Sequence, residues 1–83
     1  MSGSVEVEKL QELAEKGDAL AQTLLGAVCA KGVGGKQDFQ QALKWYRMAA
    51  DQGDAVAQFN IGQMYYNGEG VLQDYKEALS WFR

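Results

Sequence analysis

Apolar residues recur along the chain at intervals of three and four, the spacing of one face of an α-helix. Ala57, Ile61 and Met64 form one such stripe. Proline is absent, and glycine and aspartate gather between the stripes. The pattern predicts an all-α protein with five helices, over Val5–Lys16, Ala19–Lys31, Phe39–Gln52, Ala55–Asn67 and Tyr75–Arg83.

The residues between the stripes are suited to end one helix and begin the next. Asp38 and Asp74 stand at predicted helix starts, where a carboxylate accepts hydrogen bonds from unpaired backbone N–H groups and stabilises the helix by about 1 kcal/mol. Gly32 and Gly68 follow helical stripes and suit the left-handed conformation that ends a helix. These signals place the turns between the five helices.

The second half of the chain repeats the first with a shift of 36 residues. Gly17-Asp18-Ala19 returns as Gly53-Asp54-Ala55, and Trp45-Tyr46-Arg47 returns as Trp81-Phe82-Arg83. A period in this range is typical of stacked helical repeats. We therefore divide the chain into an N-terminal capping helix (1–16), a first repeat (17–52) and a second repeat that is shorter at its C-terminal end (53–83).

Two glycines, Gly26 and Gly62, lie inside predicted helices at equivalent positions. Glycine at such a position costs about 1 kcal/mol relative to alanine. The recurrence of this cost indicates a close approach of the neighbouring helix, with Tyr46 and Phe82 packing over the missing side chains.

The repeat has a recognisable signature. In the second copy it reads Ile61-Gly62-x-x-Tyr65-x-x-Gly68-x-Gly70-Val71-x-x-Asp74-x-x-x-Ala78-x-x-Trp81. The first copy keeps most of these positions but has Cys29 in place of Tyr65 and Gly35 in place of Val71. This signature resembles the Sel1-like repeat, a relative of the tetratricopeptide repeat.

The resemblance implies antiparallel helix pairs stacked as a short right-handed α-solenoid that serves as a protein–protein adaptor. Members of the family occur in bacterial envelope or secreted settings and in the eukaryotic endoplasmic reticulum, so the compartment of this chain stays open. Some members tie each helix pair with a disulfide, and a chain with Cys29 as its one cysteine cannot do so.

Composition excludes several classes of function. The net charge is −3 without a basic run, which argues against nucleic-acid binding. No apolar segment is long enough to span a bilayer. Histidine is absent, and the glycine-rich loops lack the residues that hold a phosphate. We expect no catalytic residues, no cofactor, no metal and hence no enzyme.

A partner is expected on the concave side of the array, which the first helix of each pair lines. The predicted partner-binding residues are those that face away from the core stripe: Val56, Phe59, Gln63, Tyr66, Asn67, Thr23, Ala27 and Lys31. Phe59 and Tyr66 carry most of this hypothesis, because exposed aromatic rings often anchor a partner. The alternative is that both rings pack on neighbouring helices and that the polar residues are ordinary solvated surface.

The two ends of the predicted array differ. The helix Val5–Lys16 has one apolar stripe surrounded by glutamates, as suits a terminal cap. The last helix leaves apolar residues uncovered and predicts self-association through Tyr75, Leu79, Trp81 and Phe82. The chain is also expected to be a fragment of a longer array. The leading hypothesis is a non-catalytic scaffold that binds a peptide or protein segment on its concave face; the alternative is a module that acts mainly in self-assembly.

Overall fold

The computed structural model describes residues 2–83 of the chain, with side chains from residue 6 onward. Within that range the chain forms helices and no strand, as the apolar pattern predicts. The helices are α1 (Ser2–Glu15), α2 (Ala19–Lys31), α3 (Phe39–Asp51), α4 (Ala55–Asn67) and α5 (Tyr75–Phe82). The bounds of α2 and α4 agree with the prediction, whereas α1 begins three residues earlier, because residues 2–4 carry no apolar periodicity that could mark its start.

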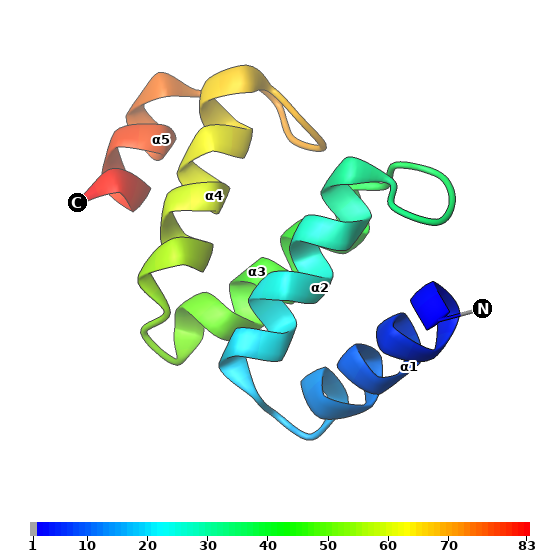
Figure 1. Cartoon of the computed structure of the whole chain (residues 1–83). Helices are drawn as coiled ribbons and strands as arrows, with labels where there is room; N and C mark the ends of the chain where they lie inside the picture. The colour runs from blue at the N-terminus through cyan, green and yellow to red at the C-terminus, as the bar shows by residue number, and fades with distance from the viewer. Residues whose placement is uncertain (1) are drawn as a thin grey trace.

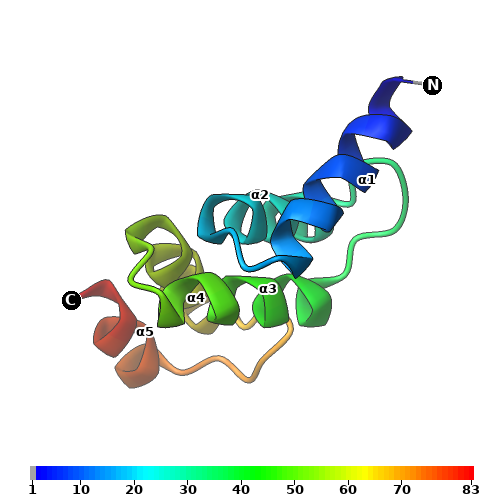
Figure 2. The same ribbon diagram turned by 90° about the horizontal axis from the view of Figure 1, so that it is seen from below.

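Consecutive helices run antiparallel and pack against one another from α1 to α5 (Figure 1). Figure 2 shows α2 and α4 on one side of the array, with α3 and α5 on the other. The described part of the chain is elongated, with extents of 41 × 26 × 13 Å, and its two ends lie at opposite ends of the array. This arrangement is a short α-solenoid of stacked helix pairs.

Aspartates begin four of the five helices. The Oδ1 atoms of Asp18, Asp38, Asp54 and Asp74 each accept a hydrogen bond from the backbone N–H three residues further on, at 2.8–3.0 Å. Gly32 and Gly68 end α2 and α4 in the left-handed region, with φ of 70° and 69°. The caps predicted from the sequence, Asp38, Asp74, Gly32 and Gly68, are therefore confirmed, and Asp18 and Asp54 cap two further helices.

The two glycines inside helices are covered by aromatic rings, as predicted. A Cβ atom placed on Gly26 would lie 2.6 Å from Cε1 of Tyr46, and one placed on Gly62 would lie 2.5 Å from Cε1 of Phe82. Both distances are far below ordinary carbon contact. The absence of a side chain thus lets the two helices of each hairpin approach closely.

The core consists of two clusters that run through the stack. The first joins the two hairpins and contains Ala42, Leu43, Tyr46, Ala49, Ala50, Ala57, Ile61 and Met64. The second ties α1 to the first hairpin and contains Ala14, Ala21, Leu25 and Trp45. Cys29, which stands in the place of Tyr65, is partly buried and packs against both clusters.

A buried glutamine adds a polar link that the apolar pattern does not reveal. Gln22 is 1% exposed, and its Nε2 donates to the carbonyl of Ala14 at 3.0 Å. Its Oε1 accepts from Nε2 of Gln52 at 3.0 Å. In the second repeat Gln58 donates to the carbonyl of Ala50 at 3.3 Å. The glutamine at this position of the repeat thus joins each hairpin to the helix that precedes it.

Candidate partner-binding groove

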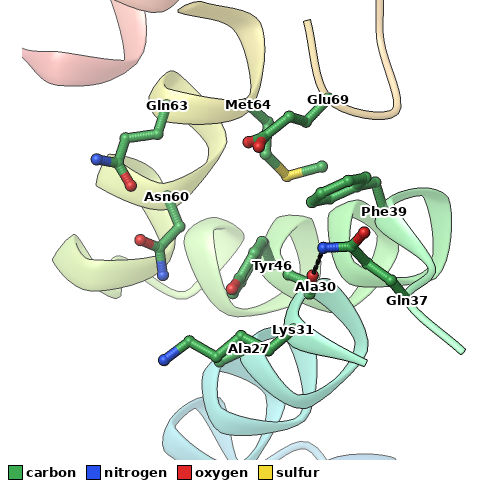
Figure 3. Close-up of a pocket in the computed structure, with 10 residues that line it drawn as sticks. All are labelled: Ala27, Ala30, Lys31, Gln37, Phe39, Tyr46, Asn60, Gln63, Met64 and Glu69. Carbon is green, nitrogen blue, oxygen red and sulfur yellow. Dashed lines mark hydrogen bonds between the residues drawn. The ribbon is translucent and has the colours of Figure 1, made fainter. Parts of the chain in front are cut away.

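An open groove of about 640 Å³ lies between α2 and α4 (Figure 3). Its lining comes from three helices and two loops: Ala27, Ala30, Lys31, Gln37, Phe39, Tyr46, Asn60, Gln63, Met64 and Glu69. The α2 wall consists of the small side chains of Ala27 and Ala30 and of Lys31, while the α4 wall carries two amides. The groove is therefore mixed in polarity, with room beside the α2 backbone.

The packing of α4 determines which of its residues reach the groove. Ala57 and Ile61 are completely buried in the cluster between the hairpins. Asn60 and Gln63 stand beside this stripe on the helical wheel, and Figure 3 shows both side chains at the α4 wall of the groove. Tyr46 forms part of the floor, because Gly26 allows its ring to lie against α2.

The loops at the end of the groove are held by a repeated hydrogen bond. Nε2 of Gln37 donates to the carbonyl of Ala30 at 2.7 Å, and Nε2 of Gln73 donates to the carbonyl of Tyr66 at 2.9 Å. Each bond ties the loop after a first helix back to the last turn of that helix. Glu69, which belongs to the second loop, is thereby positioned at the groove.

Charge and amide groups are distributed over opposite walls. Figure 3 shows Lys31 on the α2 side and Glu69 on the α4 side of the groove. Lys31 and Gln63 are exposed, and Asn60 is half-buried next to Tyr46. A molecule in the groove would therefore meet a cation on the α2 wall, and a carboxylate and two primary amides on the α4 side.

Two titratable groups beside the groove, Tyr46 and Cys29, have their neutral forms favoured by burial. Burial raises the pKa of the Tyr46 phenol above its ordinary value of 10.0, and the nearby Cys29 adds to the rise, while a hydrogen bond with Asn60 acts in the opposite direction. Burial also raises the pKa of the Cys29 thiol above 9.0, with a contribution from the charge of Asp38. A protonated thiol is a poor nucleophile, so Cys29 is not activated for covalent chemistry.

Three of the predicted partner-binding residues meet at this groove. Ala27 and Lys31 approach it from α2, and Gln63 approaches it from α4. Val56 is exposed but is not among the residues that line it. The expectation for Thr23 was wrong, because this residue is 5% exposed and its side chain is buried within the stack. It cannot contact a partner.

The remaining predicted residues lie at a second hollow, of about 410 Å³, between α4 and α5. Phe59, Tyr66 and Asn67 line it together with Gln63 and Phe82. The ring of Phe59 packs on Phe82 with centroids 5.4 Å apart, and that of Tyr66 packs on Tyr75 at 5.0 Å. Both rings nevertheless remain about half exposed. They combine the two roles considered from the sequence: contact with a neighbouring helix and an accessible face.

The two hollows are related by the sequence repeat. Ala27, Ala30, Lys31 and Tyr46 of the first hollow correspond, 36 positions on, to Gln63, Tyr66, Asn67 and Phe82 of the second. In the first hollow α4 supplies the opposite wall. In the second, none of the five helices that the structure describes does so. The second hollow therefore has only one of the two walls that enclose the first hollow.

Several groove residues were missed by the sequence interpretation. Asn60, Glu69 and Gln37 were not singled out, because helical spacing alone does not show how one hairpin is oriented against the next. One signal was present for Asn60: it replaces Leu24 of the first repeat, so a polar residue stands where the earlier copy is apolar. A departure of this kind between repeats can point to a functional position.

The residues predicted for self-association are not all on one surface. Tyr75, Leu79 and Phe82 are exposed along α5. Trp81 is instead partly buried against the cluster between the hairpins, so its side chain belongs mainly to the core. On α1, Ala14 is buried and Leu10 packs beside it, whereas Leu13 is exposed.

Across residues 2–83 no group of three or more acidic, cysteine or histidine side chains is placed to hold a metal ion. Among helices α1 to α5, none has the length and apolar character needed to cross a membrane.

Comparison with known proteins gives a consistent result. The family model described as Sel1 repeat matches residues 19–54 and 55–83. A protective antigen present in uropathogenic Escherichia coli strains, whose crystal structure displays an SLR fold, is 44% identical over 90% of this chain, with a TM-score of 0.86. A Sel1 repeat protein from Oxalobacter formigenes is 33% identical over 90%, also with a TM-score of 0.86. This chain spans 16% and 22% of those two proteins. A search of curated proteins gave no match.

Proposed function

Because the chain belongs to the Sel1 repeat family, we propose that it is a non-catalytic interaction module that binds a peptide or protein segment in the groove between α2 and α4. Sel1 repeat proteins generally mediate protein–protein interactions, and their fold is generally a non-catalytic scaffold. The match to the Sel1 repeat model confirms the resemblance that the sequence showed. Since the chain spans a small part of its relatives, the proposal concerns the surface of this segment.

The observation that carries the proposal is the pair of amides that faces a wall of small side chains. Asn60 and Gln63 project from α4, and Ala27 and Ala30 form the opposite wall. A primary amide both donates and accepts hydrogen bonds, as does each peptide unit of a bound chain. The small wall leaves space for a backbone between the helices. This arrangement suits an extended segment bound through its main chain.

The rest of the lining suggests what the segment contains. Phe39 is the accessible apolar residue at the floor of the groove, because Tyr46 and Met64 beside it are almost completely buried, and its ring favours an apolar side chain in the partner. Lys31 on one wall and Glu69 on the other favour an acidic group and a basic group in the partner. The expected partner is therefore an extended segment of mixed charge with at least one apolar anchor.

This proposal is tested with peptides selected on the chain from a displayed random library. The Asn60→Ala/Gln63→Ala double variant should bind these peptides about tenfold or more weakly in fluorescence anisotropy, because two desolvated hydrogen-bonding groups are lost. The matched control is Gln11→Ala/Gln40→Ala, which removes two exposed amides of α1 and α3 outside the groove. Equal binding by both double variants would refute the groove assignment.

A second role, assembly through α5, is supported by the exposure of Tyr75, Leu79 and Phe82. These residues form a stripe at positions i, i+4 and i+7 of the helix, which is the pattern of a helix that packs on another helix. The stripe lies away from the groove between α2 and α4, so the two roles use different surfaces.

A further inference from the structure

One end of the groove between α2 and α4 brings a carboxylate and an aromatic ring together. Glu69 belongs to the loop between α4 and α5, and Phe39 is the first residue of α3. Both residues are partly exposed and both line the groove (Figure 3). They come from different hairpins, so the pair exists only because one hairpin is stacked on the other.

The loop that carries Glu69 is held against the start of α3. A Cβ atom placed on Gly70 would lie 2.7 Å from Cβ of Phe39 and 3.1 Å from its carbonyl carbon, so this approach requires glycine. The backbone N–H of Glu69 donates to the carbonyl of Met64 at 2.9 Å. Glu69 is therefore fixed by its own backbone and by its neighbour, and its side chain starts from a defined place beside Phe39.

The fold of the loop does not require a carboxylate at this position. Glu69 corresponds to Val33, 36 positions before it, and a Cβ atom placed on the neighbouring Gly34 would meet nothing within 4 Å. Among the described residues that line the groove, Lys31 is the one cation, and Figure 3 shows it on the opposite wall. Glu69 thus presents a negative charge to the groove that no cation of the groove lining neutralises.

Gln37 adds a second acceptor at this end of the groove. Its Nε2 donates to the carbonyl of Ala30 at 2.7 Å, so its Oε1 is the atom that remains to accept, and Figure 3 shows Oε1 on the side of the amide nearer Phe39. A guanidinium group is planar and carries several N–H donors, so it can lie on an aromatic ring while it donates to acceptors at its edge. The compact ammonium group of lysine does not match this arrangement as well.

We propose that this end of the groove binds an arginine side chain of the partner peptide. Its guanidinium group lies on the ring of Phe39 and donates to the carboxylate of Glu69 and to Oε1 of Gln37. Gly70 is the positioning residue, because it holds the Glu69 loop on α3. This inference rests on the proposed function, since a peptide must occupy the groove, and it names one residue that the peptide contains.

The inference is tested with peptides selected on the chain from the displayed random library. These peptides should share an arginine, and its replacement by citrulline, a neutral group of nearly the same shape, should weaken binding about tenfold in fluorescence anisotropy. Glu69→Gln should weaken binding of the arginine peptide by a similar factor and leave binding of the citrulline peptide unchanged, because the two changes remove the same interaction. The control is Glu77→Gln, which removes an exposed carboxylate of α5 outside the groove lining and should affect neither peptide.

Gly70 and Gly34 form a matched pair for the positioning role. Both have positive φ, 74° and 77°, so alanine strains the backbone to a similar degree at either position. Only at Gly70 does the added Cβ collide with Phe39, so Gly70→Ala should reduce the difference in affinity between the arginine and citrulline peptides, whereas Gly34→Ala should keep it. Circular dichroism checks that both variants fold. An undiminished difference in Gly70→Ala would show that this contact does not position Glu69.

The outcomes separate this inference from the proposed function. Suppose that Asn60→Ala/Gln63→Ala weakens binding, but the peptides share no arginine or Glu69→Gln affects the arginine and citrulline peptides equally. The arginine site is then wrong, and the groove assignment stands. Replacement of the arginine by lysine without loss of affinity would overturn the preference for a guanidinium group. Peptides whose binding responds to neither set of variants would overturn the groove assignment and the arginine site together.

Discussion

Position 26 illustrates how a single residue controls the approach of two helices. Without a Cβ atom, Gly26 leaves the space that the ring of Tyr46 occupies, and this ring then contributes to the floor of the groove. The sequence was sufficient to predict this contact, because the glycine and the ring recur together as Gly62 and Phe82. That the Tyr46 ring also lines the groove could not be predicted, because this depends on where α4 lies, and the residues of one hairpin do not reveal that.

The two helix glycines should respond differently to alanine. Gly26→Ala should destabilise the fold by about 1–2 kcal/mol, because overpacking against the buried Tyr46 ring exceeds the gain of about 1 kcal/mol in helix propensity. Gly62→Ala should cost less, because the exposed Phe82 ring is freer to move aside. Urea unfolding measures both. A greater loss for Gly62→Ala would contradict the account.

The raised pKa values of Cys29 and Tyr46 predict a dependence of stability on pH. Their protonated forms are favoured in the folded chain, so their contribution is fully present below the ordinary values of 9.0 and 10.0. Above these values the two groups lose their protons in the unfolded chain before they lose them in the folded chain. The free energy of unfolding should therefore fall as the pH rises through the pKa values of the folded chain. Tyr46→Phe, which copies Phe82 of the second repeat, should reduce this fall in urea unfolding at alkaline pH. An unchanged slope would contradict the prediction.

At the scale of helices, capping and apolar spacing predicted most of what is observed. Asp54 begins α4 and Gly68 ends it, and the apolar stripe between them faces the core. The links between helices were harder to predict. Gln22 recurs as Gln58 in the sequence, yet only the crossing of three elements shows that its amide joins Ala14 to Gln52. Hydrogen bonds between distant segments leave no periodic signal.

The importance of these links can be compared between the repeats. Gln22→Ala should destabilise the fold by about 1–3 kcal/mol, because it leaves the Ala14 carbonyl and the Gln52 amide without their partner. Gln58→Ala should cost less, since Gln58 is only partly buried and its bond to Ala50 is longer. Thermal unfolding of the two variants measures the difference. Equal losses would indicate that burial of the amide does not matter.

At the scale of the whole molecule, the stacking of one hairpin on the other creates the groove and decides which residues are accessible. Thr23 and Phe59 are equivalent in the repeat, but Thr23 is buried in the stack and Phe59 is exposed at its end. Asn60 lies so close to the core stripe that its helical position gave no sign of accessibility. The helical array could thus be predicted from the sequence, whereas the lining of the groove depends on the angle between the hairpins.

The central claim, that the groove between α2 and α4 holds a peptide, is tested most directly by NMR titration of the isotope-labelled chain with a library-selected peptide. The account predicts that the resonances that shift most belong to the backbone of Ala27 and Lys31 and to the side-chain amides of Asn60 and Gln63. Shifts confined to α1 or to the outer face of α3, with these four residues unchanged, would contradict it.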